Sequence, residues 1–200
     1  MASVSGTAID ALIKSHLTPW FKGHGFRPKG RFFTRSTQDV VHVASVQASQ
    51  GNAPDVADFY VNLGVEWQEV RRLWTGMADD EPNPARAPCY INGRLQAIDG
   101  AVSWDALVGD PLGVALTAEL ETAAEDFWAR YSNLADVMTR LDRNERLPLG
   151  TPKWVVHAAL RRHFGDLSTA LEIIDAAASR GPAAFDYGKI RERFLDRRVA

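Results

Sequence analysis

The sequence ADFYVNLGVE, residues 57–66, decides the fold class of this chain. Apolar side chains alternate in it with polar or small ones, and a period of two is that of a β-strand with one buried face. Two earlier segments, 31–36 and 40–47, are also rich in aromatic and β-branched residues, with turn formers between them. Together the three segments predict an antiparallel meander. The side chains of residues 57–66 that are expected to face the core are Phe59, Val61, Leu63 and Val65.

Helical patterns lie on both sides of these strands. Residues 7–22 carry apolar side chains at three- and four-residue steps, which predicts an amphipathic helix. A longer stripe begins at Asp110-Pro111, where an N-cap residue precedes a proline at the first helical position, and it runs to about residue 147. Ser132-Asn133 is the point at which this stripe could break. Three shorter helices are predicted after Thr151-Pro152.

The order helix, strands, helices predicts an α+β fold. Its expected form is an antiparallel meander sheet of four to five strands, packed by an N-terminal helix and a long helix, with a C-terminal helical appendage. Residues 89–98 and 101–104 supply the last strands, around the turn signal Asp99-Gly100. The predicted domains are an α+β domain, residues 1–150, and a helical extension, residues 151–200. The extension is expected to dock on the domain, because so short a segment rarely forms a stable core unaided.

Length and composition describe an ordinary globular protein and exclude a disulfide scaffold. The chain has 200 residues, a net charge of −2 and a single cysteine, Cys89, which cannot form an internal disulfide. No run approaches the ~18 apolar residues of a membrane span. Residues 1–6 lead into an amphipathic segment instead of the apolar core of a secretory signal. The expected location is therefore the cytoplasm, with no membrane partner.

No motif for catalysis or for a cofactor fits the chain. The segment GFRPKGR, residues 25–31, has the two glycines of a phosphate-binding P-loop, but Arg31 and Phe32 stand where its lysine and hydroxyl residue belong. The histidines lack the four-residue spacing of a helical metal site, and Cys89 has no signature of a catalytic thiol. No cofactor and no metal are therefore expected. Enzymatic activity stays undecided, and the sequence favours a non-enzymatic role.

Charge is segregated along the chain. Residues 1–36 hold six basic side chains and one acidic, whereas residues 37–150 hold eight basic and eighteen acidic. A cationic N-terminal face could attract phosphate groups or an acidic protein, although such a cluster is more often only a solvated surface. The acidic middle segment would suit a basic partner.

Polar side chains at strand positions mark a candidate binding patch. Arg35, Gln47, Asn62 and Arg94 come from different predicted strands, and neighbouring strands lie only ~4.8 Å apart, so these side chains are expected to converge on one face of the sheet. Two interpretations stay open: a buried hydrogen-bond network that fixes the strand register, and a recognition surface for a protein or an anionic ligand. With the strand neighbours that share their faces, the candidate residues are Arg31, Arg35, Gln47, Tyr60, Asn62 and Arg94.

Four segments of the chain resemble a known family. They are HGFRPKGRFFTR at residues 24–35, VQAS at 46–49, FYVNLGV at 59–65 and CYINGRL at 89–95. In this succession they are similar to the bacterial domain of unknown function 4304 family, over about residues 7–140. The family has no established activity, so the resemblance implies a small α+β bacterial domain and leaves the function open.

Two hypotheses for function follow. The first is a non-enzymatic binding module of a bacterial cytoplasm, similar to an immunity protein or an antitoxin, which binds another protein through the sheet or its rim. A basic partner such as a nuclease toxin would complement the acidic middle segment. The alternative is a nucleic-acid or nucleotide-handling protein that uses the basic N-terminal face and the sheet. The oligomeric state is not predicted.

Overall fold

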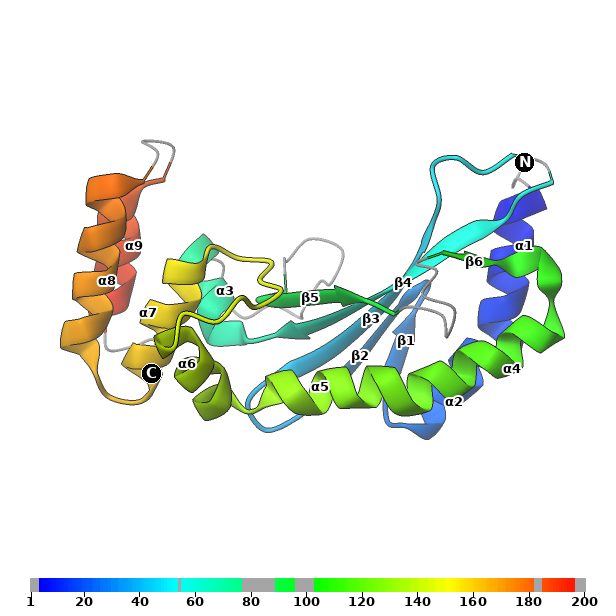
Figure 1. The fold of residues 1–200 in the computed structure, drawn as a ribbon, viewed down its shortest axis with the longest axis horizontal. Helices are drawn as coiled ribbons and strands as arrows, with labels where there is room; N and C mark the ends of the chain where they lie inside the picture. Colours follow the sequence, from blue (N-terminus) through cyan, green and yellow to red (C-terminus); the bar gives the residue numbers. More distant parts are fainter. Residues whose placement is uncertain (1–3, 54, 77–88, 96–102, 182–184, 197–200) are drawn as a thin grey trace. The chain divides into compact units, whose positions relative to one another are not determined.

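Helices and strands follow one another in the expected order, in a computed structural model that describes residues 4–53, 55–76, 89–95, 103–181 and 185–196. The α+β class is therefore confirmed (Figure 1). Two compact units share the chain. Unit 1 combines Met1–Val65 with Asn92–Arg130, and unit 2 combines Glu66–Ile91 with Tyr131–Ala200. The predicted turn Asp99-Gly100 lies outside the described residues.

The sheet contains, in the described residues, β1 (Arg27–Lys29), β2 (Phe32–Ser36), β3 (Val41–Ala48), β4 (Asp58–Glu66), β5 (Ile91–Arg94) and β6 (Trp104–Asp105). The order is β1-β2-β3-β4-β5, with β6 paired to β4. Antiparallel pairing sets Arg27 opposite Thr34 and Arg35 opposite His42. The predicted meander is confirmed, and β1 is an edge strand that the sequence analysis did not include. Pro28 fits there because an edge strand need not donate every backbone hydrogen bond.

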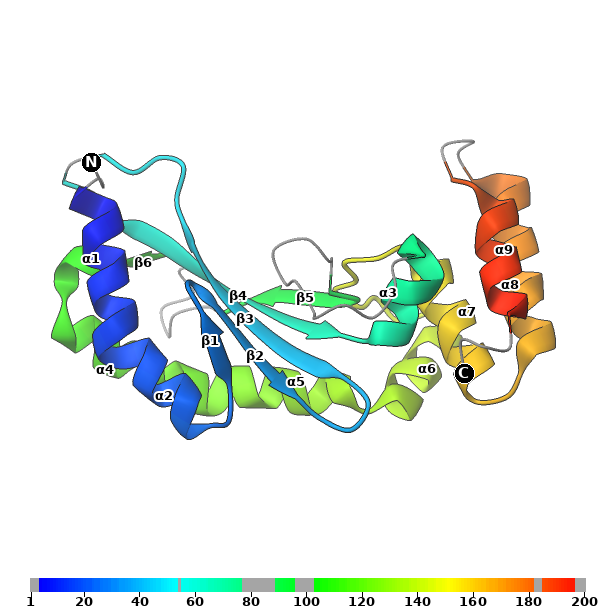
Figure 2. The same cartoon turned by 180° about the vertical axis from the view of Figure 1, so that it is seen from behind.

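Helices of unit 1 cover one face of this sheet. They are α1 (Val4–Leu12), α2 (Thr18–Gly23), α4 (Asp110–Glu119) and α5 (Glu125–Ser132), of which α5 belongs to unit 1 as far as Arg130. The ring of Phe21 stacks on Phe33 with centroids 4.0 Å apart, and Trp128 Nε1 donates to the Gly64 carbonyl at 3.1 Å. In Figure 2 the strands lie in front of α5. The predicted core residues Phe59, Val61, Leu63 and Val65 are all buried, which confirms them.

Two details of these helices differ from the pattern expected from the sequence. The N-terminal helix starts earlier than expected, and a π-helical turn, Ile13–Leu17, lies between α1 and α2. Pro19 accounts for the wider turn, because it has no N–H to donate to a carbonyl four residues earlier. Gly109, with a φ of 74°, is the N-cap of α4 in place of Asp110. Asp110 instead lies 3.0 Å from His16 Nε2.

Unit 2 is built from α3 (Gln68–Thr75), α6 (Leu134–Asp142), α7 (Lys153–His163), α8 (Leu167–Arg180) and α9 (Tyr187–Leu195). Helix α7 packs against α3, α6 and α8, and α9 contacts α3 and α8. The predicted break is confirmed, because Asn133 caps α6 by accepting from the Asp136 N–H. The three helices expected after residue 151 are present, whereas α3 was not predicted. No helix within the described ranges is both long and apolar enough to cross a membrane.

Residues 151–200, expressed alone, are expected to show no cooperative thermal transition. Helices α7 and α9 both pack against α3, which lies outside this segment. Arg193 Nη1 also donates to the carbonyls of Leu73 and Trp74, at 3.3 and 2.9 Å. Circular dichroism during heating checks the expectation. A sharp two-state transition would instead show that residues 151–200 form an independent domain. The domain boundary near residue 150 stays a prediction.

Candidate functional site

The structure divides the six residues of the predicted patch between the two faces of the sheet. Gln47, Tyr60, Asn62 and Arg94 lie together on one face, and we call these four residues the sheet patch. Arg35 lies on the helix-covered face with His42, its partner across the strands. Gln47 and His42 point to opposite sides of β3, because successive side chains of a strand alternate. The prediction of a single patch is therefore wrong for Arg35, and also for Arg31, which shares its face.

A chain of polar contacts links three strands across the sheet patch. Asn62 Nδ2 of β4 donates to Gln47 Oε1 of β3 at 3.1 Å, and Arg94 Nε of β5 donates to Asn62 Oδ1 at 3.3 Å. The guanidinium carbon of Arg94 lies 4.3 Å from the centre of the Tyr60 ring, which is a cation–π distance. Gln47 and Arg94 are exposed, and Tyr60 and Asn62 are half-buried. The network thus lies at the surface and not in the core.

The two terminal nitrogens of Arg94 have no partner among the described residues. Apart from the Nε bond and the ring contact, no hydrogen bond or ion pair reaches this side chain from the described residues. A guanidinium that is held on one side presents its remaining N–H groups as a planar fork, and this fork matches the two oxygens of a carboxylate or phosphate. The sheet patch therefore offers a fixed cation with open hydrogen-bonding capacity.

A cavity of about 470 Å³ lies beside the network, lined by Gln47, Asn62, Leu63, Asn92, Gly93 and Arg94. Asn92 and Arg94 share a face of β5 by alternation, so Asn92 adds a third amide. Gly93 faces the other way, and a Cβ there would lie 2.7 Å from the ring of Phe127 in α5. The described residues that line the cavity include amide and guanidinium groups and no acidic side chain.

Arg35 has a full set of partners within unit 1. Its Nη1 and Nη2 donate to the two oxygens of Glu125 at 2.9 and 2.7 Å, and its guanidinium carbon lies 4.5 Å from the centre of the Phe26 ring. Its Nη2 also lies 3.0 Å from His42 Nδ1. Burial and, to a smaller extent, the positive charge of Arg35 lower the pKa of His42 from 6.5 to about 4. His42 is therefore neutral at pH 7, and Arg35 ties α5 to the sheet.

Arg31 is also engaged, because its Nε donates to Asp10 Oδ1 of α1 at 2.8 Å. Arg31 and Arg35 of the basic N-terminal segment are thus both paired with carboxylates. This pairing lowers the charge that the segment can offer to phosphate groups.

Cys89 is buried, and four of the five histidines are paired with carboxylates. Within the described ranges, no three or more His, Cys, Asp or Glu side chains lie close enough to hold a metal. Cys89 is buried, and burial and the nearby Glu66 raise the pKa of its thiol to about 12, so it is not a thiolate at pH 7. Four histidines lie 2.8–3.3 Å from carboxylates, in the pairs His16–Asp110, His24–Glu121, His157–Asp142 and His163–Glu69.

Sequence reasoning missed Asn92, Glu125 and His42. A signal for Asn92 exists, because it stands two residues before Arg94 in a strand and so shares its face. The sequence contains no comparable signal for Glu125, because 90 residues separate it from Arg35 and only the packing of α5 brings the two side chains together.

Comparison with known families matches residues 17–130 to the one described as Domain of unknown function (DUF4304). This range covers more than half of the chain and contains the sheet patch as well as Arg35 and Glu125. Helices α6–α9 lie beyond it. No curated protein and no solved structure matches the chain.

Proposed function

The chain belongs to the DUF4304 family, whose domains have no known function, and we propose that it is a non-enzymatic module that binds another protein through the sheet patch. The observation that carries the proposal is the state of Arg94. Its guanidinium is positioned by Asn62 and Tyr60, and its terminal nitrogens have no partner among the described residues. Because the Arg94 side chain is ordered before binding, it loses less conformational entropy when a partner's carboxylate binds to it.

The groups around Arg94 suit a polypeptide. Gln47, Asn62 and Asn92 offer both donors and acceptors to backbone and side-chain groups. The partner is expected to place an Asp or Glu side chain against Arg94. Elsewhere, the acidic middle of the chain suits a partner that is basic overall.

A protein partner fits the sheet patch better than a nucleic acid does. Nucleic-acid affinity grows with the number of phosphates that are contacted by Lys and Arg. The sheet patch holds one cation, and Arg31 and Arg35 are already paired with Asp10 and Glu125. The nucleic-acid alternative therefore rests on other exposed cations of the N-terminal segment, such as Lys14, Lys22 and Arg27.

Within this proposal the chain acts in a bacterial cytoplasm as an immunity- or antitoxin-like partner of a basic protein. A buried free thiol at Cys89 and the absence of a second cysteine suit a reducing compartment. The product of an adjacent gene is the first partner to test, since toxins and their inhibitors must be made together.

Arg94→Ala is expected to weaken binding to that product by about tenfold or more, because a charge-assisted bidentate pair is lost. Arg94→Lys keeps the positive charge but not the planar fork of N–H groups. Its affinity should therefore lie between those of the parent and Arg94→Ala. Isothermal titration calorimetry measures the affinities. The melting temperature should change little, because surface substitutions usually shift stability by less than about 0.5 kcal/mol.

Arg27→Ala is the matched control, since Arg27 is an exposed arginine of β1 that lies outside the sheet patch. Equal losses in Arg27→Ala and Arg94→Ala would contradict the sheet patch as the binding surface. Binding to a mixed single-stranded RNA pool that falls steeply with salt, with no binding to the adjacent gene product, would favour the nucleic-acid alternative.

A further inference from the structure

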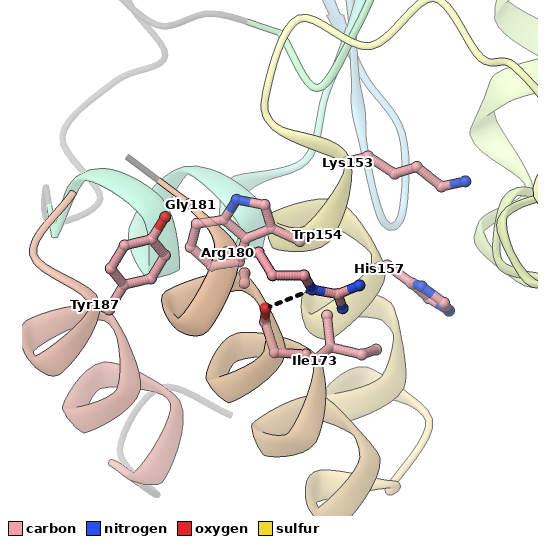
Figure 3. Close-up of a pocket in the computed structure, with 9 residues that line it drawn as sticks. Lys153, Trp154, His157, Ile173, Arg180, Gly181 and Tyr187 are labelled. Atoms are coloured by element: carbon pink, nitrogen blue, oxygen red, sulfur yellow. Dashed lines mark hydrogen bonds between the residues drawn. The ribbon is translucent and has the colours of Figure 1, made fainter. Parts of the chain in front are cut away.

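Unit 2 contains a pocket that the proposed function does not use. Its volume is about 460 Å³, and the side chains that line it come from α7, α8 and the first turn of α9 (Figure 3). Trp154 and His157 belong to α7, Arg180 is the last residue of α8, and Tyr187 is the first of α9. A pocket of this size is suited to a small organic molecule.

One side of the pocket is aromatic. The rings of Trp154 and Tyr187 have centroids 5.4 Å apart and planes inclined by 34°. Trp154 also makes edge-to-face contacts with Trp74 and Phe185, with centroids at 5.8 and 6.4 Å. Ile173 and two alanines of α8 complete the apolar lining. Supported rings with defined orientations provide a flat surface on which a ligand ring can stack.

The other side of the pocket is cationic. Arg180 Nε donates to the Ala176 carbonyl at 3.2 Å, and Lys153 Nζ donates to Asn144 Oδ1 at 2.5 Å. Neither cation has a carboxylate within ion-pair distance in the described part of unit 2. His157 contacts Asp142 at 2.8 Å, and Arg161 contacts the same oxygen at 2.6 Å, so the charge of this nearby acid is balanced. The pocket therefore carries a net positive charge.

A buried hydroxyl adds a polar contact at the edge of the pocket. Tyr187 Oη is buried and has no hydrogen-bond partner among the described residues. It lies against Gly181, where a Cβ would be 1.9 Å from it, so the glycine makes room for the hydroxyl. Buried hydroxyl groups normally have a partner, and a bound acceptor at this edge would supply one.

We propose that this pocket binds a small aromatic carboxylate. The ligand ring stacks on Trp154 and Tyr187, and its carboxylate pairs with Arg180, with Lys153 adding long-range attraction. This inference is independent of the sheet patch, which lies in unit 1, and its test does not require the protein partner.

The test is a nuclear magnetic resonance titration of the full chain with 3-phenylpropanoate, which follows the indole N–H signal of Trp154 after assignment with Trp154→Phe. A saturable shift is expected at millimolar probe, with affinity about tenfold weaker for the neutral 3-phenylpropanamide and for Arg180→Ala. Ala177→Leu, which fills the pocket without changing its charge, should abolish the shift. Arg146→Ala, an exposed arginine of unit 2 that does not line the pocket, should leave it unchanged.

Three results would overturn the proposal. Equal affinity for the carboxylate and the amide would show an apolar pocket with no anion site. An equal shift with inorganic phosphate alone would show a general cationic surface. No saturable shift with 3-phenylpropanoate, in a variant set whose circular dichroism spectra match the parent, would exclude an aromatic carboxylate site altogether.

Discussion

Arg71→Met is expected to lower the free energy of unfolding by about 3–5 kcal/mol, because it leaves a buried carboxylate without its counter-charge. Arg71 Nε lies 3.1 Å from Glu66 Oε1, and the two side chains are 6% and 1% exposed. No hydrogen bond reaches either oxygen of Glu66 from the described residues, so Arg71 is the counter-charge of this carboxylate. Burial already raises the pKa of Glu66, and Arg71 opposes that increase.

The double variant Glu66→Leu, Arg71→Met distinguishes the loss of the ion pair from the loss of side-chain packing. Replacing a buried ion pair with apolar groups of similar volume is often neutral or stabilising, so the double variant should regain most of the stability. Urea unfolding measures Arg71→Met and the double variant, with Gln68→Met, at an exposed position of the same helix, as the control. A double variant as unstable as Arg71→Met would contradict the ion pair as the cause.

The single variant Arg71→Met should become less stable as the pH rises. In Arg71→Met the folded-state pKa of Glu66 is raised above its unfolded value near 4.5, so the folded state binds more protons than the unfolded state. Its destabilisation should therefore be small at pH 4 and full near neutrality.

Acid is expected to destabilise unit 1 between pH 6.5 and 4, by up to about 3 kcal/mol, through His42. Burial, and then Arg35, lower the folded-state pKa of His42 from 6.5 to about 4, with Glu125 opposing. In this window the unfolded chain binds a proton that the folded chain does not. The free energy of unfolding should thus be constant with respect to this group above pH 6.5 and fall as the pH decreases toward 4.

His42→Asn is the matched control, because its amide oxygen can accept from Arg35 in place of Nδ1 but does not titrate. Carboxylates also affect stability in acid, so the difference between the parent and His42→Asn isolates the histidine. Urea unfolding across the pH range should show that the free energy of unfolding of the parent, relative to that of His42→Asn, decreases as the pH falls from 6.5 to 4. Parallel curves would show that His42 does not control acid stability.

Much of the fold is encoded in patterns of near neighbours along the chain. Alternation in residues 57–66 is sufficient to identify β4 and its buried face, and Asn133 marks the start of α6 as an N-cap. The same alternation brings Asn62 and Arg94 to one face, because β4 and β5 are neighbours in the sheet. These features depend on strand and helix periods, which act over a few residues.

Helix α3 was not predicted because it lacks local sequence signals. It follows Trp67, which provides no side-chain cap, and its position depends on packing with α7 and α9. Edge strand β1 has only three residues, all of them exposed, so it has no apolar period from which to identify it.

Only the tertiary structure decided what each charged side chain does. Arg35 shares its strand face with buried Phe33, a position that a cation can hold only when a counter-charge reaches it. Glu125 provides that counter-charge from a distant helix, while Arg94 receives none from the described residues. The pocket of unit 2 likewise combines side chains of three helices. Such pairings depend on which elements pack together, and this information is spread over the whole chain instead of a few neighbouring residues.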